Sequence, residues 1–151
     1  SKCISLTEIK IPGNIREIGY KSFSGCSGLR EISIPSTVKT VGIGAFENCT
    51  ELKDISLPTT LTEINYYTFS GCTSLTTLTL HSKLTAINNY AFAGCKSLTE
   101  IHCKNSNPPL IGENTFRDVN RIGCKIFVPS KRAKKSYSTA LYWNEFTIYI
   151  E

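Results

Sequence analysis

The seven cysteines are the first residues whose chemistry has to be weighed. Five of them recur every 23 residues, at Cys3, Cys26, Cys49, Cys72 and Cys95. In stacked identical units these thiols lie about 4.8 Å apart, one strand spacing, and fill the core as small apolar side chains. Disulfides between neighbouring units are a lesser alternative, because parallel Cβ vectors suit bridge geometry poorly. A zinc site is less favoured still, because the sequence has no closely spaced C-x-x-C type pair.

Only two histidines, His81 and His102, could serve as a general base. Catalysis of that kind needs an activated serine or cysteine within hydrogen-bond reach. The neighbouring Thr77, Thr79 and Glu100 do not assemble into such a group, so solvent-facing histidines are favoured over contacts to a metal or partner. The sequence also lacks the phosphate-loop, dinucleotide and H-E-x-x-H zinc motifs. It therefore predicts no enzyme activity, no catalytic residue, no bound metal and no cofactor.

Two columns of polar residues recur with the same period and are expected to face solvent. The first column is Glu8, Glu31, Asp54, Thr77 and Glu100. The second is Lys10, Ser33, Ser56, Thr79 and His102, with His81 close by. Neighbouring carboxylates in a sheet repel, so one interpretation is a site for a basic or cation-bridged partner. The favoured alternative is that water screens these charges and that Arg30 and Lys53 offset them. In either case a flat polar sheet suits a protein or glycan better than a small metabolite.

The composition is that of one ordered domain. The 151 residues are 40% hydrophobic and 19% charged, which excludes a disordered chain. No apolar run reaches the roughly 18 residues of a membrane helix. The formal net charge is +5, and residues 76–151 hold ten Lys and Arg against five Asp and Glu. The basic run 131–135 favours a solvated face or cap over attraction to an anionic glycan, envelope or nucleic acid. No aromatic residues are interleaved with it, so no nucleic-acid partner is expected.

A 23-residue repeat predicts the elements that position these residues. Phenylalanine recurs at Phe23, Phe46, Phe69, Phe92 and, one residue late, Phe116. Each unit opens with an L-x-x-I-x-I segment, such as 29–34, that alternates apolar and polar residues like a half-buried strand. A proline ends the strand, as Pro35 does after that segment. One unit cannot bury its apolar edge alone, so stacked units must share a continuous core.

The rest of each unit predicts a tight bend and a short turn. Gly19, Gly42, Asn65 and Asn88 occupy one repeat position. These residue types tolerate positive φ, which predicts a left-handed bend at that position. The following A-F-x-x-C segment, residues 45–49 in the second unit, is too short for a long helix and favours a single helical or 3₁₀ turn.

The combined pattern L-x-x-I-x-I-P-x-x-V-x-x-I-G-x-x-A-F-x-x-C-x-x-L resembles the BspA-like (Treponema pallidum-type) leucine-rich repeat over about residues 3–122. The segment from Cys124 to Glu151 is similar to the C-terminal cap of such repeats in surface proteins of Bacteroides-like anaerobes. The resemblance implies an α/β repeat fold, a right-handed leucine-rich-repeat solenoid of 23-residue units. Each unit is expected to contain one short parallel strand and short helical or 3₁₀ turns.

We expect one continuous domain. Residues 1–122 comprise about five repeats, truncated at the N-terminus within a longer product, and residues 123–151 comprise the final strand and the C-terminal cap. The insertion at 105–109 shifts the register of the last repeats, as is common in terminal units. The side chains expected to cover the open edge of the core are Tyr137, Trp143, Phe146 and Ile148.

The resemblance also implies secretion or display at the bacterial outer surface, and adhesion-type binding to a protein or glycan of the host matrix or of another cell. The chain is expected to be a monomeric, non-catalytic binding module that presents its strand face. The expected ligand-binding residues are Glu8, Lys10, Glu31, Ser33, Asp54, Ser56, Thr77, Thr79, His81, Glu100 and His102. The alternative is a structural spacer or an accessory domain of a larger surface protein.

Overall fold

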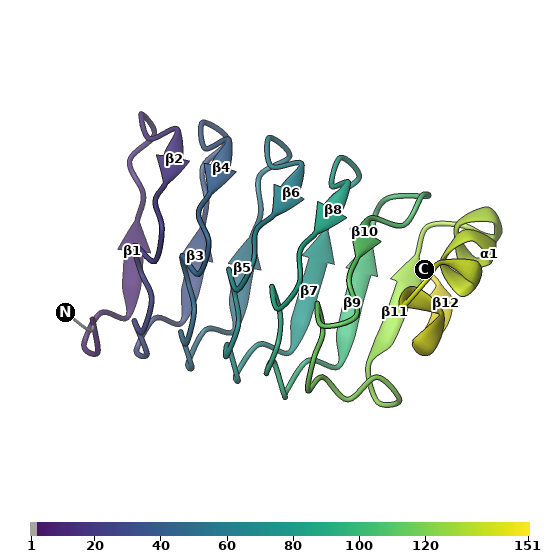
Figure 1. Ribbon diagram of the computed structural model, residues 1–151. Helices are drawn as coiled ribbons and strands as arrows, with labels where there is room; N and C mark the ends of the chain where they lie inside the picture. Colours follow the sequence, from purple (N-terminus) through teal and green to yellow (C-terminus); the bar gives the residue numbers. More distant parts are fainter. Residues whose placement is uncertain (1–2) are drawn as a thin grey trace.

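The computed structural model describes residues 3–151, and in it the chain is a solenoid of about six turns of about 23 residues. Successive turns stack along one axis, and a helical cap follows the last turn (Figure 1). Every strand pair is parallel and joins one turn to the next or to the cap. The repeat solenoid implied by the sequence is confirmed.

Two ladders of strands enclose the core. The first ladder contains β1 (Glu8–Lys10), β3 (Glu31–Ser33), β5 (Asp54–Ser56), β7 (Thr77–Leu80), β9 (Glu100–Cys103), β11 (Lys125–Val128) and β12 (Thr147–Ile150). The second contains β2 (Glu17–Ile18), β4 (Thr40–Val41), β6 (Glu63–Ile64), β8 (Ala86–Ile87) and β10 (Leu110–Ile111). We call the outward side of the first ladder the strand face. The sequence predicts only one strand in each unit, because the two-residue second strand is too short to show an alternating pattern.

The first ladder forms because its residues alternate between core and solvent. In β3 the side chain of Ile32 is buried, while Glu31 and Ser33 are exposed. In β7 the buried positions are Leu78 and Leu80. Burying an aliphatic side chain of this size contributes about 1.5–3 kcal/mol. The inward half of each strand therefore stabilises the ladder, and the outward half is available for other roles.

A column of stacked phenylalanine rings runs through the core. Neighbouring ring centroids are 5.3 Å apart for Phe23–Phe46, 5.5 Å for both Phe46–Phe69 and Phe69–Phe92, and 5.6 Å for Phe92–Phe116. These separations are favourable for aromatic pairs. The one-residue slip expected at Phe116 is confirmed, because its ring continues the column.

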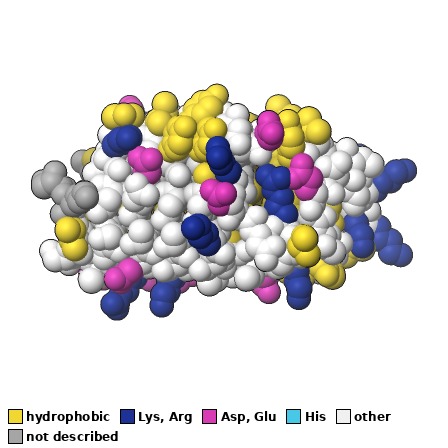
Figure 2. Space-filling view, turned by 60° about the horizontal axis from the view of Figure 1, so that its bottom comes forward, with side chains coloured by type: hydrophobic (Ala, Val, Ile, Leu, Met, Phe, Trp, Pro, Cys, Tyr) yellow, Lys and Arg dark blue, Asp and Glu magenta, His cyan; other side chains and the backbone are white. Residues whose placement is uncertain are grey.

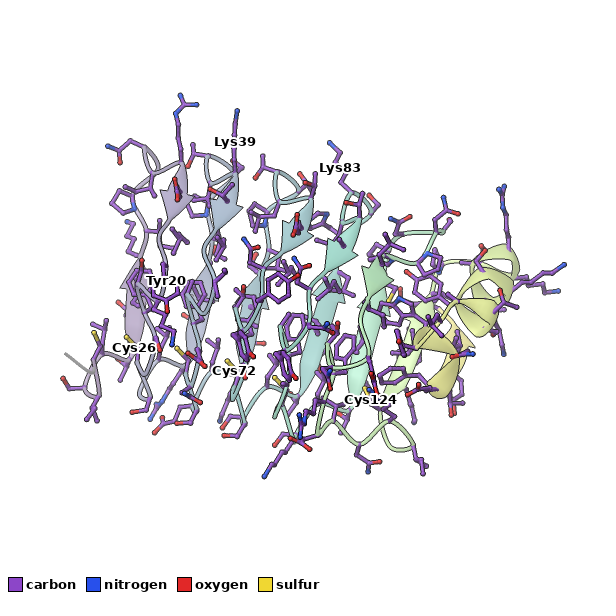
Figure 3. All side chains as sticks on the ribbon, in the orientation of Figure 1. Tyr20, Cys26, Lys39, Cys72, Lys83 and Cys124 are labelled. Carbon is purple, nitrogen blue, oxygen red and sulfur yellow. The ribbon has the colours of Figure 1, made fainter. Side chains whose placement is uncertain are left out.

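The recurring cysteines form a second buried column beside the rings. Cys26, Cys49, Cys72 and Cys95 are buried thiols without a disulfide, whereas Cys3 is half-buried (Figure 3). The Sγ of Cys49, Cys72 and Cys95 donates to a phenylalanine carbonyl oxygen of the preceding turn at 3.3, 3.5 and 3.3 Å. A thiol is a weak donor, so each bond adds little, but the repeated geometry explains why a small side chain with a donor recurs there. Cys103 and Cys124 are also buried free thiols.

The left-handed positions of the turns differ from the prediction. The residues with positive φ lie two positions later, at Lys21, Gly44, Tyr67 and Tyr90, and again at Gly25, Asn48, Gly71 and Gly94. The predicted column has another cause, since a Cβ on Gly42 would lie 2.7 Å from backbone atoms of Gly19 and Tyr20. Where asparagine occupies the position, its amide binds the turn before: Asn65 Nδ2 donates to the Val41 carbonyl at 2.9 Å. Contact between turns, rather than φ, selects Gly or Asn there.

The A-F-x-x-C segment forms short hydrogen-bonded turns and not a long helix, as expected. In the second unit the amide of Ala45 donates to the carbonyl of Gly42 at 3.2 Å, and that of Cys49 donates to Phe46 at 3.3 Å. This spacing of three residues is that of a 3₁₀ turn. The chain thus reverses within a few residues and returns to the next strand.

The cap consists of α1 (Lys131–Thr139), the 3₁₀ helix η1 (Trp143–Glu145) and β12, which pairs with β11. The side chains expected to close the core are buried: Tyr137, Trp143, Phe146 and Ile148.

The inserted segment 105–109 anchors the cap. Tyr137 Oη donates to the carbonyl of Asn105 at 3.2 Å, and Trp143 Nε1 donates to that of Pro109 at 2.8 Å. Both aromatic groups bring a polar atom into the core, and a buried donor without a partner would cost about 1–3 kcal/mol. The insertion therefore supplies the acceptors that let these two large rings be buried.

Candidate functional site

The strand face brings the predicted site residues into two straight columns. Pairing of β1, β3 and β5 aligns Glu8, Glu31 and Asp54 in one column and Lys10, Ser33 and Ser56 in the next. Pairing of β7, β9 and β11 aligns Thr77, Glu100 and Lys125, and beside them Thr79, His102 and Phe127. Neighbouring members of a column are one strand spacing apart, about 4.8 Å.

A groove of about 750 Å³, open to solvent, lies over the first three strands of this face. Its polar lining is Glu8, Lys10, Glu31, Ser33, Asp54 and Ser56. The hydrogen-bonded ladder is interrupted between β5 and β7, and the half-buried Ile55 beside the interruption also lines the groove. The groove therefore offers carboxylates, hydroxyls and some apolar surface along three consecutive turns.

Three carboxylates and one cation, Lys10, line the groove. No ion pair of residues 3–151 involves Glu8, Glu31 or Asp54. Arg30, expected to offset this column, pairs instead with Glu51, with 3.3 Å between Nε and Oε2. Like charges directly opposed in a sheet are destabilising. The groove therefore gathers three carboxylates that no ion pair within residues 3–151 neutralises.

The C-terminal half of the strand face carries an aromatic stack that the sequence pattern did not assign to a site. The ring centroids of His102 and Phe127 are 4.8 Å apart, and those of Phe127 and Tyr149 are 5.6 Å apart. The two ring nitrogens of His102 face carboxylates, Nδ1 at 2.6 Å from Glu151 and Nε2 at 3.3 Å from Glu100. The alternation of buried and outward residues around Phe127 was a sequence signal that could have placed this ring on the outward side. No such signal existed for Tyr149, because its position depends on the pairing of β12 with β11.

His81 lies apart from the two columns. It follows the last residue of β7 and is half-buried. Its Nδ1 accepts a hydrogen bond from the amide of Lys83 at 3.2 Å, and burial lowers the pKa of His81. The cross-strand partner of His102 is Thr79, so the two histidines are not paired across strands.

A second surface, on the turns, gathers tyrosines that the repeat pattern did not reveal. Tyr20, Ile43, Tyr66 and Tyr67 are exposed apolar side chains on three consecutive turns. The rings of Tyr67 and Tyr90 stack with centroids 4.8 Å apart, although both residues have positive φ, at 58° and 64°. Figure 2 shows hydrophobic side chains gathered in patches on a largely polar surface. Ring stacking, worth about 0.5–1.5 kcal/mol, offsets part of the backbone strain.

The thiols are poor nucleophiles in this fold. Burial raises the pKa of Cys49, Cys95 and Cys124 to about 12, so the reactive thiolate is scarce at neutral pH. Within residues 3–151, no group of three or more His, Cys, Asp or Glu side chains is arranged to hold a metal ion. The buried thiols are therefore not activated for chemistry.

The described helices are too short or too polar to cross a membrane.

Comparison with known proteins identifies the repeat. Residues 1–127 match the family described as BspA type Leucine rich repeat region, in six copies. No curated protein matched the chain.

Solved structures of bacterial proteins show the same fold. A leucine rich cell surface protein from Faecalibacterium prausnitzii superposes with a TM-score of 0.74 and 29% identity, over 92% of this chain and 34% of that one. The pneumococcal vaccine antigen PcpA superposes with a TM-score of 0.60 and 22% identity, over 93% of this chain and 40% of that one. A leucine-rich repeat protein from Bacteroides ovatus superposes with a TM-score of 0.50 and 21% identity, over 99% of this chain and 56% of that one. This chain thus spans between 34% and 56% of the length of these three proteins.

Two findings agree: a six-copy match over most of the chain and a stacked parallel solenoid. The chain belongs to the BspA type leucine-rich repeat family and is a non-enzymatic repeat module of the kind found in bacterial surface proteins.

Proposed function

We propose that this chain is a binding module of a secreted or cell-surface bacterial protein, and that its strand face binds a protein or glycan of a host or of another cell. Residues 1–122 act as the repeat array and 123–151 as the final strand and cap, within one monomeric domain. The observation that carries the proposal is the open groove over β1, β3 and β5, with three carboxylates that form no ion pair within residues 3–151.

The shape of the groove favours a macromolecular partner. Sites for small metabolites are concave and mostly apolar, with a few polar groups. This groove extends across three strands, is open to solvent, and is lined by charged and hydroxyl side chains such as Glu31 and Ser33. Binding there would consist of many weak polar contacts spread along the solenoid, which a long polymer or a protein surface can make at once.

The rigidity of the scaffold supports the same conclusion. Stacked rings and hydrogen-bonded turns connect each turn of the solenoid to the next. A partner would therefore meet a preformed surface and would not lose affinity to ordering the site. The relative from Faecalibacterium prausnitzii is described as a cell surface protein, which supports a similar location for this chain.

The test is charge reversal in the groove. Glu31→Lys combined with Asp54→Lys inverts its centre, whereas Glu17→Lys combined with Glu113→Lys makes the same charge change at exposed positions outside it. Binding is measured by surface plasmon resonance to an immobilised mammalian extracellular-matrix protein extract and on an array of purified glycans. We expect the groove variant to lose at least about 10-fold in affinity, equal to about 1.4 kcal/mol, and the control to bind normally.

Both double variants should unfold within about 0.5 kcal/mol of the unmodified chain, because surface substitutions rarely change stability more. If the groove variant and the control bind equally well, the strand face is not the site. If the unmodified chain binds neither the extract nor any glycan, the spacer function is the better description.

A further inference from the structure

The outward face of α1 carries four cations without acidic counterparts. These are Lys131, Arg132, Lys134 and Lys135, all exposed, and no ion pair of residues 3–151 involves them. We call this set the basic helix face. The two nearest following carboxylates are used elsewhere, because Glu145 pairs with Arg121 and Glu151 pairs with Lys104. Much of the positive net charge is therefore concentrated at one end of the molecule.

Helix stability does not explain these cations. The first turn of α1 has no acidic residue, although its free N–H groups make that end of the helix electropositive. Lys131 and Lys135 are four residues apart and Lys131 and Lys134 three apart, spacings at which like charges destabilise a helix. The cap needs only the buried face of α1, which consists of Ala133 and Tyr137, and the N-cap bond from Ala133 N to Ser130 Oγ at 3.1 Å. The basic helix face opposes folding and must be accounted for in another way.

The cations spread widely around the helix. Since each residue of an α-helix advances by about 100°, the four cations cover an arc of about 160°. That arc is centred opposite Ala133 and Tyr137, which pack into the core. In Figure 3 long nitrogen-tipped side chains project from α1 at the end of the solenoid, and in Figure 2 Lys and Arg gather at one end of the molecule. The charge is thus displayed on a convex surface rather than in a plane.

We propose that the basic helix face is a docking surface for an acidic polysaccharide, a flexible chain carrying sulfate, phosphate or carboxylate groups. Binding relieves the repulsion among the four cations and releases the counterions of the polymer. A flexible chain can bend around an arc of about 160°, whereas a flat anionic bilayer meets only the cations nearest to it. The cap rings Tyr137 and Trp143 are buried, so neither offers nucleic-acid bases a platform beside the basic helix face. This surface is separate from the strand face and acts without it.

Heparin affinity of the complete 151-residue chain tests the proposal, with heparin as the acidic polysaccharide. The test variant is Lys131→Gln, Arg132→Gln, Lys134→Gln and Lys135→Gln. The matched control replaces four exposed lysines elsewhere by glutamine: Lys39, Lys53, Lys83 and Lys96. Figure 3 shows Lys39 and Lys83 projecting from the turns, far along the solenoid from α1. Both variants lose the same charge, so only the position differs.

We expect the chain to bind heparin, the control to keep most of that affinity, and the test variant to bind at least about 10-fold more weakly. The slope of log Kd against log salt should fall by about three in the test variant. Equal losses in both variants would mean that only net charge matters and would overturn the proposal. So would failure of the unmodified chain to bind heparin at physiological salt.

Two further ligands test the choice of partner. Vesicles containing phosphatidylglycerol and a single-stranded oligonucleotide should both be released at lower salt than heparin. Tighter binding of either would refute the polysaccharide as the partner. Thermal unfolding of the test variant should occur at the same or a higher temperature than that of the unmodified chain, because like-charge repulsion is removed. If the test variant instead unfolds at a lower temperature than the unmodified chain, its fold is impaired and a double variant, Lys131→Gln with Lys135→Gln, is used in its place. We expect this double variant to lose heparin affinity, by less than the fourfold substitution would. No loss of heparin affinity would refute the proposal.

Discussion

Alkaline pH should unfold this protein steeply, because its core contains many thiols. Burial raises the pKa of Cys49, Cys95, Cys103 and Cys124 to about 12. In the unfolded chain the same groups titrate near about 8.5. Below that pH both states carry the proton and the thiols do not affect the equilibrium. Between about pH 8.5 and 12 the unfolded chain loses its protons while the folded chain keeps them, so stability falls as pH rises.

The size of the effect follows from the four pKa values. Each thiol lowers the free energy of unfolding by about 1.4 kcal/mol per pH unit in this range, and the four together by about 5 kcal/mol per unit. At pH 10 the accumulated loss is about 8 kcal/mol, which is comparable to the whole stability of a domain, about 5–15 kcal/mol. Burial also raises the pKa of Cys72 and raises that of Cys26 to about 11, which adds to the loss. We therefore expect unfolding near pH 10.

Urea unfolding in reducing buffer, repeated between about pH 7.5 and 9.5, measures this dependence. The single tryptophan, Trp143, is 1% exposed and reports the folded state by its fluorescence. Replacing Cys49→Ala and Cys95→Ala removes two of the six buried thiols with a raised pKa and should lower the pH slope by about a third. A control with Ser24→Ala and Ser70→Ala, which removes no titrating group and lies in the turns that precede those of the two cysteines, should leave the slope unchanged. An identical slope in the cysteine variant and the control would refute the reasoning.

Two further predictions compare matched positions of the repeat by urea unfolding. Phe69→Ala removes a ring that is stacked on both sides and 1% exposed, and should lower the free energy of unfolding by about 3–5 kcal/mol. Phe23→Ala removes the half-buried ring at the end of the column and should lower it clearly less. Equal losses would contradict the stacked column. Gly42→Ala places a Cβ 2.7 Å from the backbone of the preceding turn and should lower the free energy of unfolding by about 1–3 kcal/mol. Gly13→Ala, with open space around the new Cβ, should leave stability unchanged. A neutral Gly42→Ala would contradict the close approach of the two turns.

Much of the candidate site could be predicted because the repeat is regular. When identical units stack, residues at the same repeat position become neighbours, so the column of Glu8, Glu31 and Asp54 follows from spacing alone. The buried rings and thiols follow in the same way, including the slip at Phe116. The aromatic stack at the other end did not follow, because Tyr149 belongs to the cap and has no counterpart in the repeat.

Conformation within the turns could not be predicted from residue type. Glycine and asparagine at positions 42 and 65 indicated positive φ, yet the left-handed residues lie at 44 and 67. Gly42 is required because another backbone lies close to it, and Asn65 binds a carbonyl of the turn before. These are contacts between turns, and the residue types alone do not distinguish them from a conformational requirement.

By itself, the amino-acid sequence determined the period, the inward and outward columns, and hence the family and the strand face. Only the tertiary structure showed that Arg30 binds Glu51 rather than offsetting the groove and that the inserted segment anchors the cap. It also showed that the cations of α1 form no ion pair within residues 3–151. The physical reason is the range of the interactions. Contacts that repeat with the period are encoded in the spacing, whereas contacts between unlike segments depend on how the folded chain brings them together.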